Sequence, residues 1–589
     1  MSFIIRHNIT DVGLEDLLFL INCHLPTIVH KSKYLFLNKF PKTANIVTHF
    51  YCINCFTLFD FVGKNINTKC PDCRKKYNQK VLQHDGNFFI QLPLKEQLSN
   101  VVSSYYNNFQ RTNDTNYISD IYSGSVYKSL QRKNKISDLD ITLQWNTDGV
   151  QVFKSSKVSM WPIQVAINEL PYRDRRNSII LCGLWYGTVK PNTQLFLKPF
   201  VNDLRDLHYN GITFTPSGQI DRITIKVHTL LSPIDSVARP VVQYISQYNG
   251  KFGCSLCFNK GERMRVGKGH ARVFCGGIGI KRSKKKHEKH VEKPITEKRR
   301  VFGVKGFSLK MFIPLFNIIY SFPPEYMHCV LLGVCKTFAT MWFDSKNFQK
   351  PWYIGTRVNL YDQKLKKIMT CHEISRTTDS IENFGLWKAS QWKHHLLYYS
   401  LVCLKDILPL RYYKHWLLLV FSIYTILKGR FSIQEFRSAK RALQQFVEDT
   451  ETLYGKEYMK YNIHLLLHIS DSVKQFGALW AWSAFPFEHY NSILTKILHN
   501  SQSVPQQICK SYLRLQNIKN STIFQNCSVS GKSLFNKMFG DSNIDKYLHF
   551  GLLKICGCAQ QVELSVIEQH LITEVLGEEI MTNACSYEN

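Results

Sequence analysis

The sequence lacks a long uninterrupted apolar run, and it lacks the features of a secretory signal. Its longest apolar stretch, Trp416 to Leu427, is interrupted by Ser422, Tyr424 and Thr425 and falls short of the roughly 20 residues that span a bilayer. The N-terminal sequence MSFIIRHNIT has no charged start followed by a long apolar stretch and a small-residue cleavage site. We therefore expect neither membrane attachment nor secretion.

Acidic residues are scarce beside basic ones. There are 44 Asp and Glu residues against 75 Lys and Arg, which gives a formal net charge of +31. A positive field of this size attracts polyanions, most often nucleic acids or anionic membrane surfaces, although charge alone is also compatible with a merely soluble basic protein. Because nothing indicates secretion, we interpret the 18 cysteines as thiols and metal ligands rather than as a disulfide framework.

No internal repeat of fixed period is present, and 589 residues suggest three or four units at about 150 residues each. Period-two alternation or short apolar runs predict strands in ITLQWNTDGVQVF, MWPIQVAI, SIILCGLWYG and RITIKVHTLL. A polar linker with some helix is expected near residues 100–138, and a helix in VARPVVQYISQY. Residues 281–300 read as a flexible basic stretch, residues 305–470 as mostly helical, and FEHYNSILTKILHN as a further helix.

Two Cys-x-x-Cys pairs near the N-terminus have the spacing of a zinc site. Cys52 and Cys55 form the first pair, and Cys70 and Cys73 form the second. Each turn brings two thiolates within reach of one ion, and two such turns complete a tetrahedral site, as in a zinc ribbon. The alternative is four cysteines of a buried core. The zinc would be structural, and its segment would either contact DNA or protein or only stabilise the fold.

A third pair, Cys254 and Cys257, is weak evidence by itself, because the strand and helix context of a redox motif is absent. If this pair binds zinc, its best partners are His464 and His468, whose spacing puts both rings on one face of a helix. Taken alone, two histidines among leucines are more often core or surface residues than ligands.

Three carboxylates occupy positions suited to binding catalytic metal ions. Asp148 ends an alternating strand, Asp235 ends a second strand and precedes a helix, and Glu488 lies near the start of a helix. Two-metal phosphoryl-transfer enzymes need two or three converging carboxylates, and ribonuclease H-like nucleases place them on two strands and a helix. A strand-end Asp is more often a turn or cap residue, however, and composition does not select these three from the 44 acidic residues.

Six separated segments resemble, in order, the transposases of CACTA (En/Spm) elements: SKVSMWPIQVAINELPYRDR, LWYGTVKPNTQLFLKPFVNDL, DSVARPVVQYISQYNGKFGCSLC, PPEYMHCVLLGV, NIHLLLH and FPFEHYNSILTKILHNSQSVPQQI. The resemblance covers roughly residues 140–515. It implies a DDE-type catalytic core in which Asp148 of NTDGV, Asp235 of PIDSVARP and Glu488 of FPFEHYN are the catalytic residues. They would bind Mg²⁺ or Mn²⁺. The segment PPEYMHCV carries Glu325 and His328, which the resemblance leaves open as a pair near the metals, a DNA contact or packing.

The layout also resembles, more distantly, that of the catalytic subunit of the V(D)J recombinase. There, a Cys-x-x-Cys shortly after the second Asp and a His pair shortly before the Glu share one zinc ion. Cys254, Cys257, His464 and His468 occupy the corresponding places in this sequence. The resemblance thus implies a second Zn²⁺ site that joins the two ends of an insertion.

The expected fold class is α/β: a ribonuclease H-like core with a large, mainly helical insertion, preceded by a small N-terminal zinc ribbon. The expected domains are an N-terminal segment (1–48), the zinc ribbon (49–75), a linker with helix (76–138), the first part of the core (139–257), a basic and helical insertion (258–463), the last part of the core with the catalytic helix (464–515) and a C-terminal region (516–589).

The expected function is that of a metal-dependent DNA transposase, which cleaves transposon ends and transfers 3′-hydroxyl strands to target DNA. A domesticated DNA-binding protein without cleavage activity is the alternative, against which the intact carboxylate triad argues; a nuclease without joining activity is a third reading. Double-stranded DNA is the expected partner. We expect a homo-oligomer, because two transposon ends must be held together, and we expect it in the nucleus. The basic residues 281–300 would be a nuclear-localisation signal, a DNA-contacting loop or a solvated loop.

Overall fold

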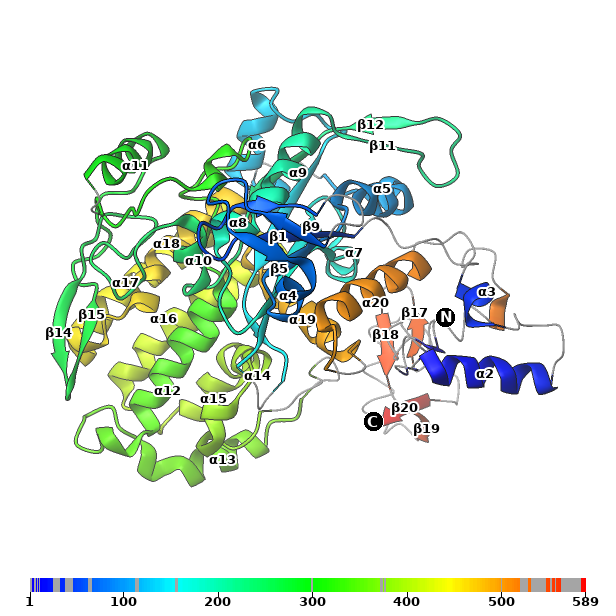
Figure 1. Cartoon of the computed structure of the whole chain (residues 1–589). Helices are drawn as coiled ribbons and strands as arrows, with labels where there is room; N and C mark the ends of the chain where they lie inside the picture. Colours follow the sequence, from blue (N-terminus) through cyan, green and yellow to red (C-terminus); the bar gives the residue numbers. More distant parts are fainter. Residues whose placement is uncertain are drawn as a thin grey trace. The chain divides into compact units, whose positions relative to one another are not determined.

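A computed structural model of the chain describes residues 11–24, 32–37, 46–61, 66–111, 116–153, 157–297, 300–370, 378–498 and 501–519, with shorter pieces at 3–4, 7, 9, 374, 528–530, 547–550, 553–556, 558–562 and 584–588. It divides into two compact units (Figure 1). The larger unit comprises residues 40–369 and 376–516, and the smaller comprises residues 1–39, 370–375 and 517–589.

A mixed sheet forms the centre of the larger unit. Its strands follow the order β13-β7-β9-β10-β5-β1-β2, and β8 adds to β9. The bounds are β1 Val47–Tyr51, β2 Leu58–Phe59, β5 Phe88–Gln91, β7 Ile141–Thr147, β8 Val150–Gln151, β9 Ser159–Ile167, β10 Ile180–Gly187 and β13 Val227–Leu231. Neighbours pair antiparallel except β13 and β7, which run parallel, with Val227 opposite Ile141.

The strands expected from sequence around residues 141–147, 160–167 and 180–187 are confirmed as β7, β9 and β10. The fourth segment is divided into β12 (Ile223–Ile225), which pairs with β11 (Ile212–Phe214) in a hairpin, and β13. Every residue of β7 and β13 is buried. β7 nevertheless alternates at period two, because one of its buried faces carries the polar residues Thr142, Gln144 and Asn146, whose side chains are hydrogen-bonded.

Helices cover both faces of the sheet. On one face, apolar side chains of α19 (Phe485–Lys496) and α20 (Val504–Lys519) pack on β5, β9 and β10 in one cluster. On the other face, Trp145 packs against Phe200 of α9 (Lys198–Tyr209), and Trp185 packs against Phe196 of α8 (Thr193–Phe196). α5 (Leu94–Tyr105) also contacts β10, so the polar linker expected there begins with a helix of the core.

A helical insertion lies between β13 and α19, as the sequence predicted for residues 305–470 (Figure 1). Its longer helices are α12 (Lys336–Phe343), α13 (Val358–Lys366), α16 (Leu410–Leu427), α17 (Ile433–Tyr454) and α18 (Tyr461–Phe476), with shorter α14 (Ala389–His394) and α15 (Ser400–Leu404) and π-helical turns η4 (Met327–Cys335) and η8 (His395–Tyr399). α16 and α17 pack lengthwise on each other. No helix in the described part of the chain is long and apolar enough to cross a membrane.

One sequence-based expectation in this region is wrong, and a second is confirmed only in part. The basic stretch 281–300 contains helix α11 (Lys284–Glu297) where we expected flexible chain. His287 and Val291, one turn apart, give this charged helix a buried side. The helix expected over residues 237–248 is only α10 (Ala238–Gln243), because Tyr244 adopts a left-handed conformation with φ 60° and ends it.

Remaining elements of the larger unit are short. They are β3 Asn67–Lys69, β4 Lys76–Asn78, α4 Gln79–His84, β6 Tyr117–Ile118, α6 Ser125–Arg132, α7 Tyr172–Asn177, β14 Glu262–Val266, β15 Gly269–Val273 and β16 Phe431–Ser432, with 3-10 turns η1 Tyr106–Asn108, η2 Ile121–Ser123, η3 Leu309–Phe312, η5 Ser345–Asn347, η6 Gly355–Arg357, η7 Ile381–Leu386, η9 Lys456–Tyr458 and η10 Leu479–Trp482. The β14–β15 hairpin was not expected from the sequence.

The smaller unit contains α2 (Asp11–His24) and α3 (Lys33–Leu37), which an ion pair between Glu15 and Lys33 joins at 3.2 Å. It also contains two antiparallel hairpins, β17 (Tyr547–Phe550) with β18 (Leu553–Cys556) and β19 (Cys558–Val562) with β20 (Ala584–Glu588).

Two buried histidines make the insertion sensitive to acid. Burial lowers the pKa of His395 to about 3 and that of His415 to about 4. Both rings are therefore neutral in the folded protein, whereas in the unfolded chain they take up protons below about pH 6.5. The free energy of unfolding should be highest above pH 6.5 and fall towards pH 4, by about 1.4 kcal/mol per pH unit for each ring.

Urea unfolding between about pH 7 and 5 measures this slope. His415→Gln should lose the contribution of one ring, so its slope should be smaller by about 1.4 kcal/mol per pH unit. Leu419→Ala, in the same helix, should lower stability at every pH and leave the slope as in the wild type. Equal slopes for the wild type and His415→Gln would contradict the assignment.

Candidate metal centres and carboxylate cluster

Two adjacent parallel strands bring Asp148 and Asp235 to the same edge of the sheet. Asp148 directly follows β7, and Asp235 lies shortly after β13, which pairs with β7. The segment just after β13 is bonded to the end of β7: Ser232 Oγ donates to Trp145 O at 2.7 Å, and Asn146 Nδ2 donates to Pro233 O at 2.7 Å. Carboxyl ends of parallel neighbours meet at one edge, so these carboxylates meet although 86 residues separate them.

Close packing fixes the turn after β7. Asp148 Oδ1 accepts a hydrogen bond from Gly149 N at 2.7 Å. A Cβ atom on Gly149 would lie 2.6 Å from Cζ2 of Trp161, so no other residue fits without a shift of the indole ring. Asp235 is fixed differently, because its Oδ1 accepts from Val237 N and Ala238 N at the start of α10.

Glu488 reaches this edge from helix α19. Gln164 Nε2 of β9 donates to Asn491 Oδ1 of α19 at 2.9 Å, and Gln144 Nε2 of β7 donates to Ala481 O at 3.1 Å. These buried bonds hold α19 and the turn before it on the sheet. Ligand atoms of Asp148, Glu488 and His328 lie within 4.8 Å of one another, and all three residues are partly exposed. Asp235 is not part of this closest group.

Glu325 holds His328 in the cluster. The Glu325 carboxylate is buried and accepts from Met327 N, His328 N and Ala484 N at 2.9 to 3.0 Å. Its Oε2 also lies 2.9 Å from Nδ1 of His328. Glu325 thereby joins the start of η4 to the start of α19, and directs the His328 ring at the carboxylates. Of the readings left open by the sequence, this geometry favours a pair beside the carboxylate cluster.

Electrostatics in the cluster reflect crowding of like charges. Burial, and then the charges of Asp235 and Glu488, raise the pKa of Asp148 to about 7. Burial also raises the pKa of Glu488. Burial alone would lower the pKa of His328, but the hydrogen bond and charge of Glu325, with the charges of Asp235 and Asp148, raise it to about 9. A site with this excess of carboxylates is suited to divalent cations.

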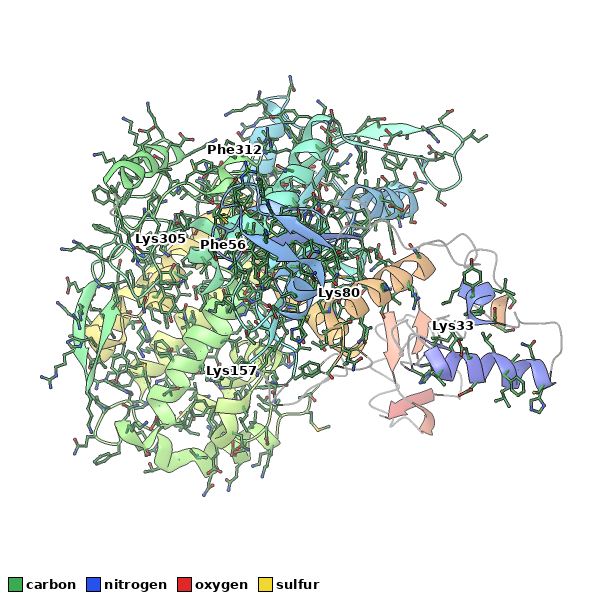
Figure 2. All side chains as sticks on the ribbon, viewed as in Figure 1. Lys33, Phe56, Lys80, Lys157, Lys305 and Phe312 are labelled. Carbon is green, nitrogen blue, oxygen red and sulfur yellow. The ribbon has the colours of Figure 1, made fainter. Side chains whose placement is uncertain are left out.

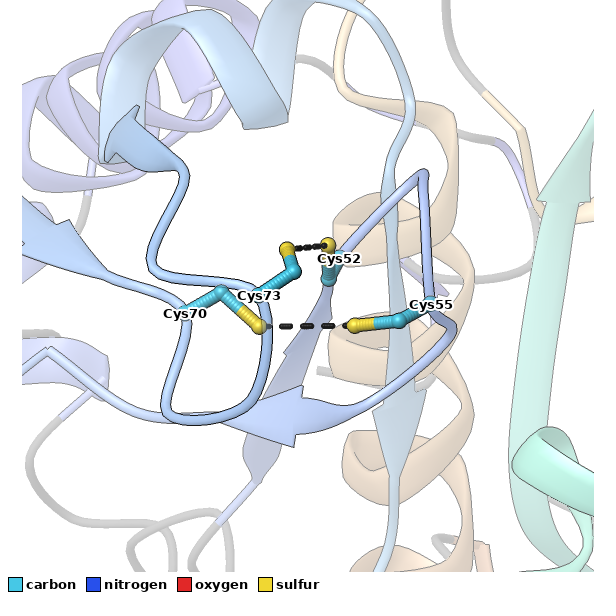
Figure 3. Close-up of side chains that lie close together, drawn as sticks. All are labelled: Cys52, Cys55, Cys70 and Cys73. Atoms are coloured by element: carbon cyan, nitrogen blue, oxygen red, sulfur yellow. Dashed lines mark hydrogen bonds between the residues drawn. The ribbon is translucent and has the colours of Figure 1, made fainter.

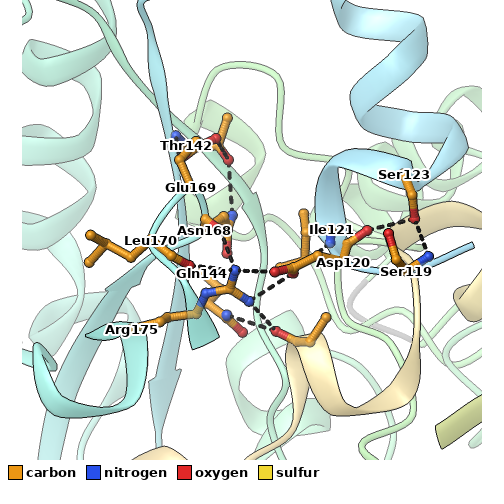
Figure 4. A network of polar contacts seen from close by, with 11 residues as sticks. Ser119, Asp120, Ile121, Ser123, Thr142, Gln144, Asn168, Glu169, Leu170 and Arg175 are labelled. Atoms are coloured by element: carbon orange, nitrogen blue, oxygen red, sulfur yellow. Dashed lines mark hydrogen bonds and ion pairs between the residues drawn. The ribbon is translucent and has the colours of Figure 1, made fainter. Parts of the chain in front are cut away.

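A buried ion pair supports the turn that precedes α19 (Figure 4). Arg175 of α7 binds Asp120 through two nitrogens, at 2.6 and 2.9 Å, and both side chains are almost fully buried. Its Nη1 also donates to Ala481 O at 3.1 Å, and its Nη2 donates to the carbonyls of Asn168 and Leu170. The guanidinium therefore joins the sheet, the segment around Asp120 and the turn before the Glu488 helix.

Arg175→Leu should lower the free energy of unfolding by about 3–5 kcal/mol, because the carboxylate of Asp120 would remain buried without its partner. Denaturant unfolding measures the change. Lys95→Leu is the matched control, since Lys95 and Asp206 form a half-exposed pair at 3.2 Å whose loss should cost less than about 1 kcal/mol. The double variant Arg175→Leu with Asp120→Asn should recover part of the loss. If Arg175→Leu and Lys95→Leu lowered the free energy of unfolding equally, this role of Arg175 would be refuted.

Cys254, Cys257, His464 and His468 converge as one buried cluster, as the sequence predicted. Cys254 Sγ lies 3.6 Å from His468 Nε2, Cys257 Sγ lies 3.4 Å from His464 Nε2, and the two Nε2 atoms lie 3.3 Å apart. A tetrahedral zinc ion with usual bond lengths would separate sulfur from nitrogen by about 3.6 Å and nitrogen from nitrogen by about 3.3 Å. The donors therefore fit Zn²⁺.

Surrounding groups stabilise this cluster. Arg282 donates to the carbonyls of Cys254 and Cys257 at 2.9 and 3.1 Å, which holds the Cys-x-x-Cys turn. The His464 ring stacks on Phe274, with centroids 5.1 Å apart, while its buried Nδ1 has no acceptor in the described part of the chain. Because Cys254 and His468 are 214 residues apart, a metal ion here would clip together the ends of the insertion.

Cys52, Cys55, Cys70 and Cys73 form a second thiol cluster at the turns of two small hairpins (Figure 3). Sulfur atoms of Cys52 and Cys73 lie 3.4 Å apart, and those of Cys55 and Cys70 lie 3.5 Å apart, close to the about 3.8 Å expected around tetrahedral zinc. The four cysteines thus meet as the sequence predicted.

This cluster is attached to the central sheet. β1, which ends just before Cys52, pairs with β5, and β5 pairs with β10. Phe56 in the first turn and Lys305 line the same pocket of about 490 Å³ (Figure 2). The Cys-rich segment is therefore an extension of the larger unit, and β5, which connects it, lies in the region where the sequence suggested a linker.

Three converging donor clusters define the chain as a candidate metalloprotein, with carboxylates suited to hard cations and thiols suited to zinc. Residues 123–298, less than a third of the chain, match the family model described as Transposase family tnp2. No curated protein matches the chain. The matched segment contains Asp148, Asp235 and the Cys254–Cys257 pair, and it ends before Glu488. It supports a transposase family for this chain, which suggests an enzyme of the nuclease and strand-transferase type and implies DNA binding.

Sequence reasoning missed several residues of this region. Arg175 and Asp120 gave no signal, because nothing local indicates that two charged groups 55 residues apart are buried together. Nor could the sequence predict that Glu325 accepts hydrogen bonds from three backbone amides. The spacing of Glu325 and His328 was the only sign that the two side chains would pair.

Proposed function

We propose that the chain is a DDE-type DNA transposase of the CACTA (En/Spm) kind, with Asp148, Asp235 and Glu488 as its catalytic carboxylates. The observation that carries the proposal is the approach of these carboxylates: Asp148 and Asp235 follow adjacent parallel strands, and Glu488, on a helix held on the same sheet, shares one donor cluster with Asp148. The charge of Asp235 contributes to the raised pKa of Asp148, so Asp235 lies near this pair. The antiparallel strands β7, β9 and β10, with β13 parallel to β7, support a ribonuclease H-like core.

Mg²⁺ or Mn²⁺ ions fit the oxygen donors of these three residues, and would supply a lowered pKa for the attacking hydroxyl and charge stabilisation for the leaving oxygen. In the first step, water attacks the phosphorus at a transposon end. The bond from phosphorus to the 3′ oxygen breaks, which leaves a 3′-hydroxyl and a 5′-phosphate. In the second step, that 3′-hydroxyl attacks a phosphorus of target DNA and forms a new phosphodiester. The bond from that phosphorus to the 3′ oxygen of the target strand breaks, which leaves a 3′-hydroxyl on the target.

The chain's own groups have distinct tasks in these steps. The three carboxylates would hold the divalent ions, which would position the reacting oxygens, and no covalent enzyme intermediate is required. Asp148 and Asp235 are set by backbone amides, so they do not depend on DNA for their orientation. His328, held by Glu325, places positive charge at a site where phosphate oxygens become more negative.

The wider proposal is a homo-oligomer that acts on double-stranded DNA in the nucleus, with Zn²⁺ in both thiol clusters. Purified protein, Mg²⁺ or Mn²⁺ and labelled duplexes taken from DNA that flanks the coding sequence test the activity. We expect nicks at a defined terminal sequence and joined products with a second duplex. Binding without cleavage at either metal would favour the domesticated DNA-binding protein instead.

A further inference from the structure

One face of the β14–β15 hairpin is entirely basic. Arg263 pairs with Arg272, and Arg265 pairs with His270, across the two strands. Directly opposed residues of an antiparallel pair lie on the same face, so these four side chains form one patch, the hairpin basic face. The other face carries Met264 and Ala271. Like charges placed opposite each other destabilise a hairpin, so this arrangement has a cost in the absence of an anion.

The charges of this patch are not neutralised by the protein. Within the described part of the chain, Arg263, Arg265 and His270 are exposed and have no ion pair or side-chain hydrogen bond. Arg272 is held by the carbonyls of Asn249 and Gly261, at 3.1 and 2.8 Å, and carbonyl oxygens leave its positive charge uncompensated. The patch is therefore available to an external anion.

The hairpin basic face borders a pocket of about 770 Å³ next to the carboxylate cluster. Arg263, His270 and Arg272 line it together with Lys460, and no carboxylate does. Ser236 and Val237, which directly follow Asp235 in the chain, also line the pocket. Its two lining tyrosines, Tyr248 and Tyr461, stack on each other with centroids 5.7 Å apart.

The base of the hairpin is tied to the buried Cys and His cluster. Phe274, just after β15, donates its N–H to Met459 O at 2.7 Å, and its ring stacks on His464. Lys460 is the residue that precedes α18, whose first turns carry His464. The hairpin and Lys460 are thus both attached to the segment that carries His464. Their positions relative to Asp235 therefore do not depend on the exposed strands alone.

We propose that the hairpin basic face and Lys460 bind the sugar–phosphate backbone of duplex DNA where it runs past Asp235. The inference rests on the proposed function, since it assumes that DNA is the substrate, and it assigns the element of the insertion that holds it. The positive charge of the pocket and the absence of carboxylates from its lining point to phosphate recognition independent of sequence.

The test measures DNA binding by fluorescence anisotropy without divalent ions, on two labelled duplexes of unrelated sequence, over a range of salt concentrations. Arg263→Ala with Arg265→Ala should weaken binding to both duplexes alike by about 10-fold or more, and should reduce the slope of log affinity against log salt by roughly 2. Lys460→Ala, on another element, should reduce the slope by about 1. Arg263→Lys with Arg265→Lys keeps the charge and should keep the slope.

Lys366→Ala with Lys367→Ala is the matched control. It removes two exposed charges at the end of α13, away from the hairpin (Figure 1), and should bind as the wild type does. If the hairpin and Lys460 variants bind as this control does, the inference is overturned, and a loss on only one duplex would overturn the backbone assignment.

Asp148→Asn separates the two proposals, because it should stop cleavage and keep the wild-type salt slope. A wild type that binds with the expected slopes but never cleaves would refute the proposed activity alone.

Discussion

Asp148→Asn, Asp235→Asn and Glu488→Gln should each reduce DNA cleavage and strand transfer by about 10³-fold or more. A carboxamide keeps the shape of the side chain and removes the negative charge that binds a divalent ion. Loss of that charge stabilisation costs several kcal/mol in the transition state, and about 1.4 kcal/mol corresponds to a factor of ten in rate. Single-turnover cleavage of an end-labelled duplex in Mg²⁺ measures the loss.

These substitutions separate catalysis from folding. Asn at position 235 can still accept the hydrogen bonds from Val237 N and Ala238 N, because Asn caps helices about as well as Asp does. Asn at position 148 can likewise accept from Gly149 N. The thermal unfolding of both variants should therefore stay close to that of the wild type.

Asp203→Asn is the matched control for the carboxylates. Burial raises the pKa of Asp203 to about 6, and its carboxylate accepts from Gln91 Nε2 at 2.7 Å, so it is another half-buried aspartate of the same unit. It lies outside the carboxylate cluster and should cleave DNA at the wild-type rate. Cleavage by Asp148→Asn at the rate of Asp203→Asn would refute the assignment of Asp148.

Loss of the buried Cys and His cluster should have the largest effect on stability. His468→Ala should release one zinc ion per chain and lower the free energy of unfolding by more than about 5 kcal/mol, because a structural zinc site contributes its binding energy to folding. The ion would join segments more than 200 residues apart, so both ends of the insertion should loosen together. Metal analysis and denaturant unfolding measure the two changes.

Cys335→Ser provides the control for this prediction. Cys335 is buried at the end of η4, outside both thiol clusters, and its replacement should leave two zinc ions per chain. Cys70→Ser should release one zinc ion from the other cluster, with a smaller effect on the carboxylate edge, since that cluster is joined to the sheet through β1 and β5. A wild-type protein that binds no zinc would rule out both sites.

Much of the carboxylate edge followed from sequence because its parts are local. Asp148 and Asp235 follow strands that were recognisable from period-two alternation, and Glu488 lies near the start of a helix with an apolar stripe. What no local pattern could supply was the pairing of β13 beside β7, since parallel neighbours are joined through long connections and leave no turn signature. The identity of the three residues came from the family resemblance, and their roles in catalysis stay predictions.

The places where sequence failed have physical causes. Residues 284–297 looked like a solvated run of charge, yet His287 and Val291 give that helix a buried side that composition does not reveal. The hairpin of Arg263 and Arg265 was overlooked because its basic residues are few and dispersed, and only the strand pairing places them on one face. Asp120 and Arg175 were ordinary polar residues until their burial made them a pair.

By itself, the sequence determined the net positive charge, the Cys-x-x-Cys turns and the helical spacing of His464 and His468, because these depend on composition or on neighbours within a few residues. Only the tertiary structure decided that these thiols and imidazoles meet, that Glu325 turns His328 towards Asp148 and Glu488, and that a basic hairpin borders the pocket beside Asp235. The reason is that each of these contacts joins segments distant in sequence, and packing around the central sheet brings them together.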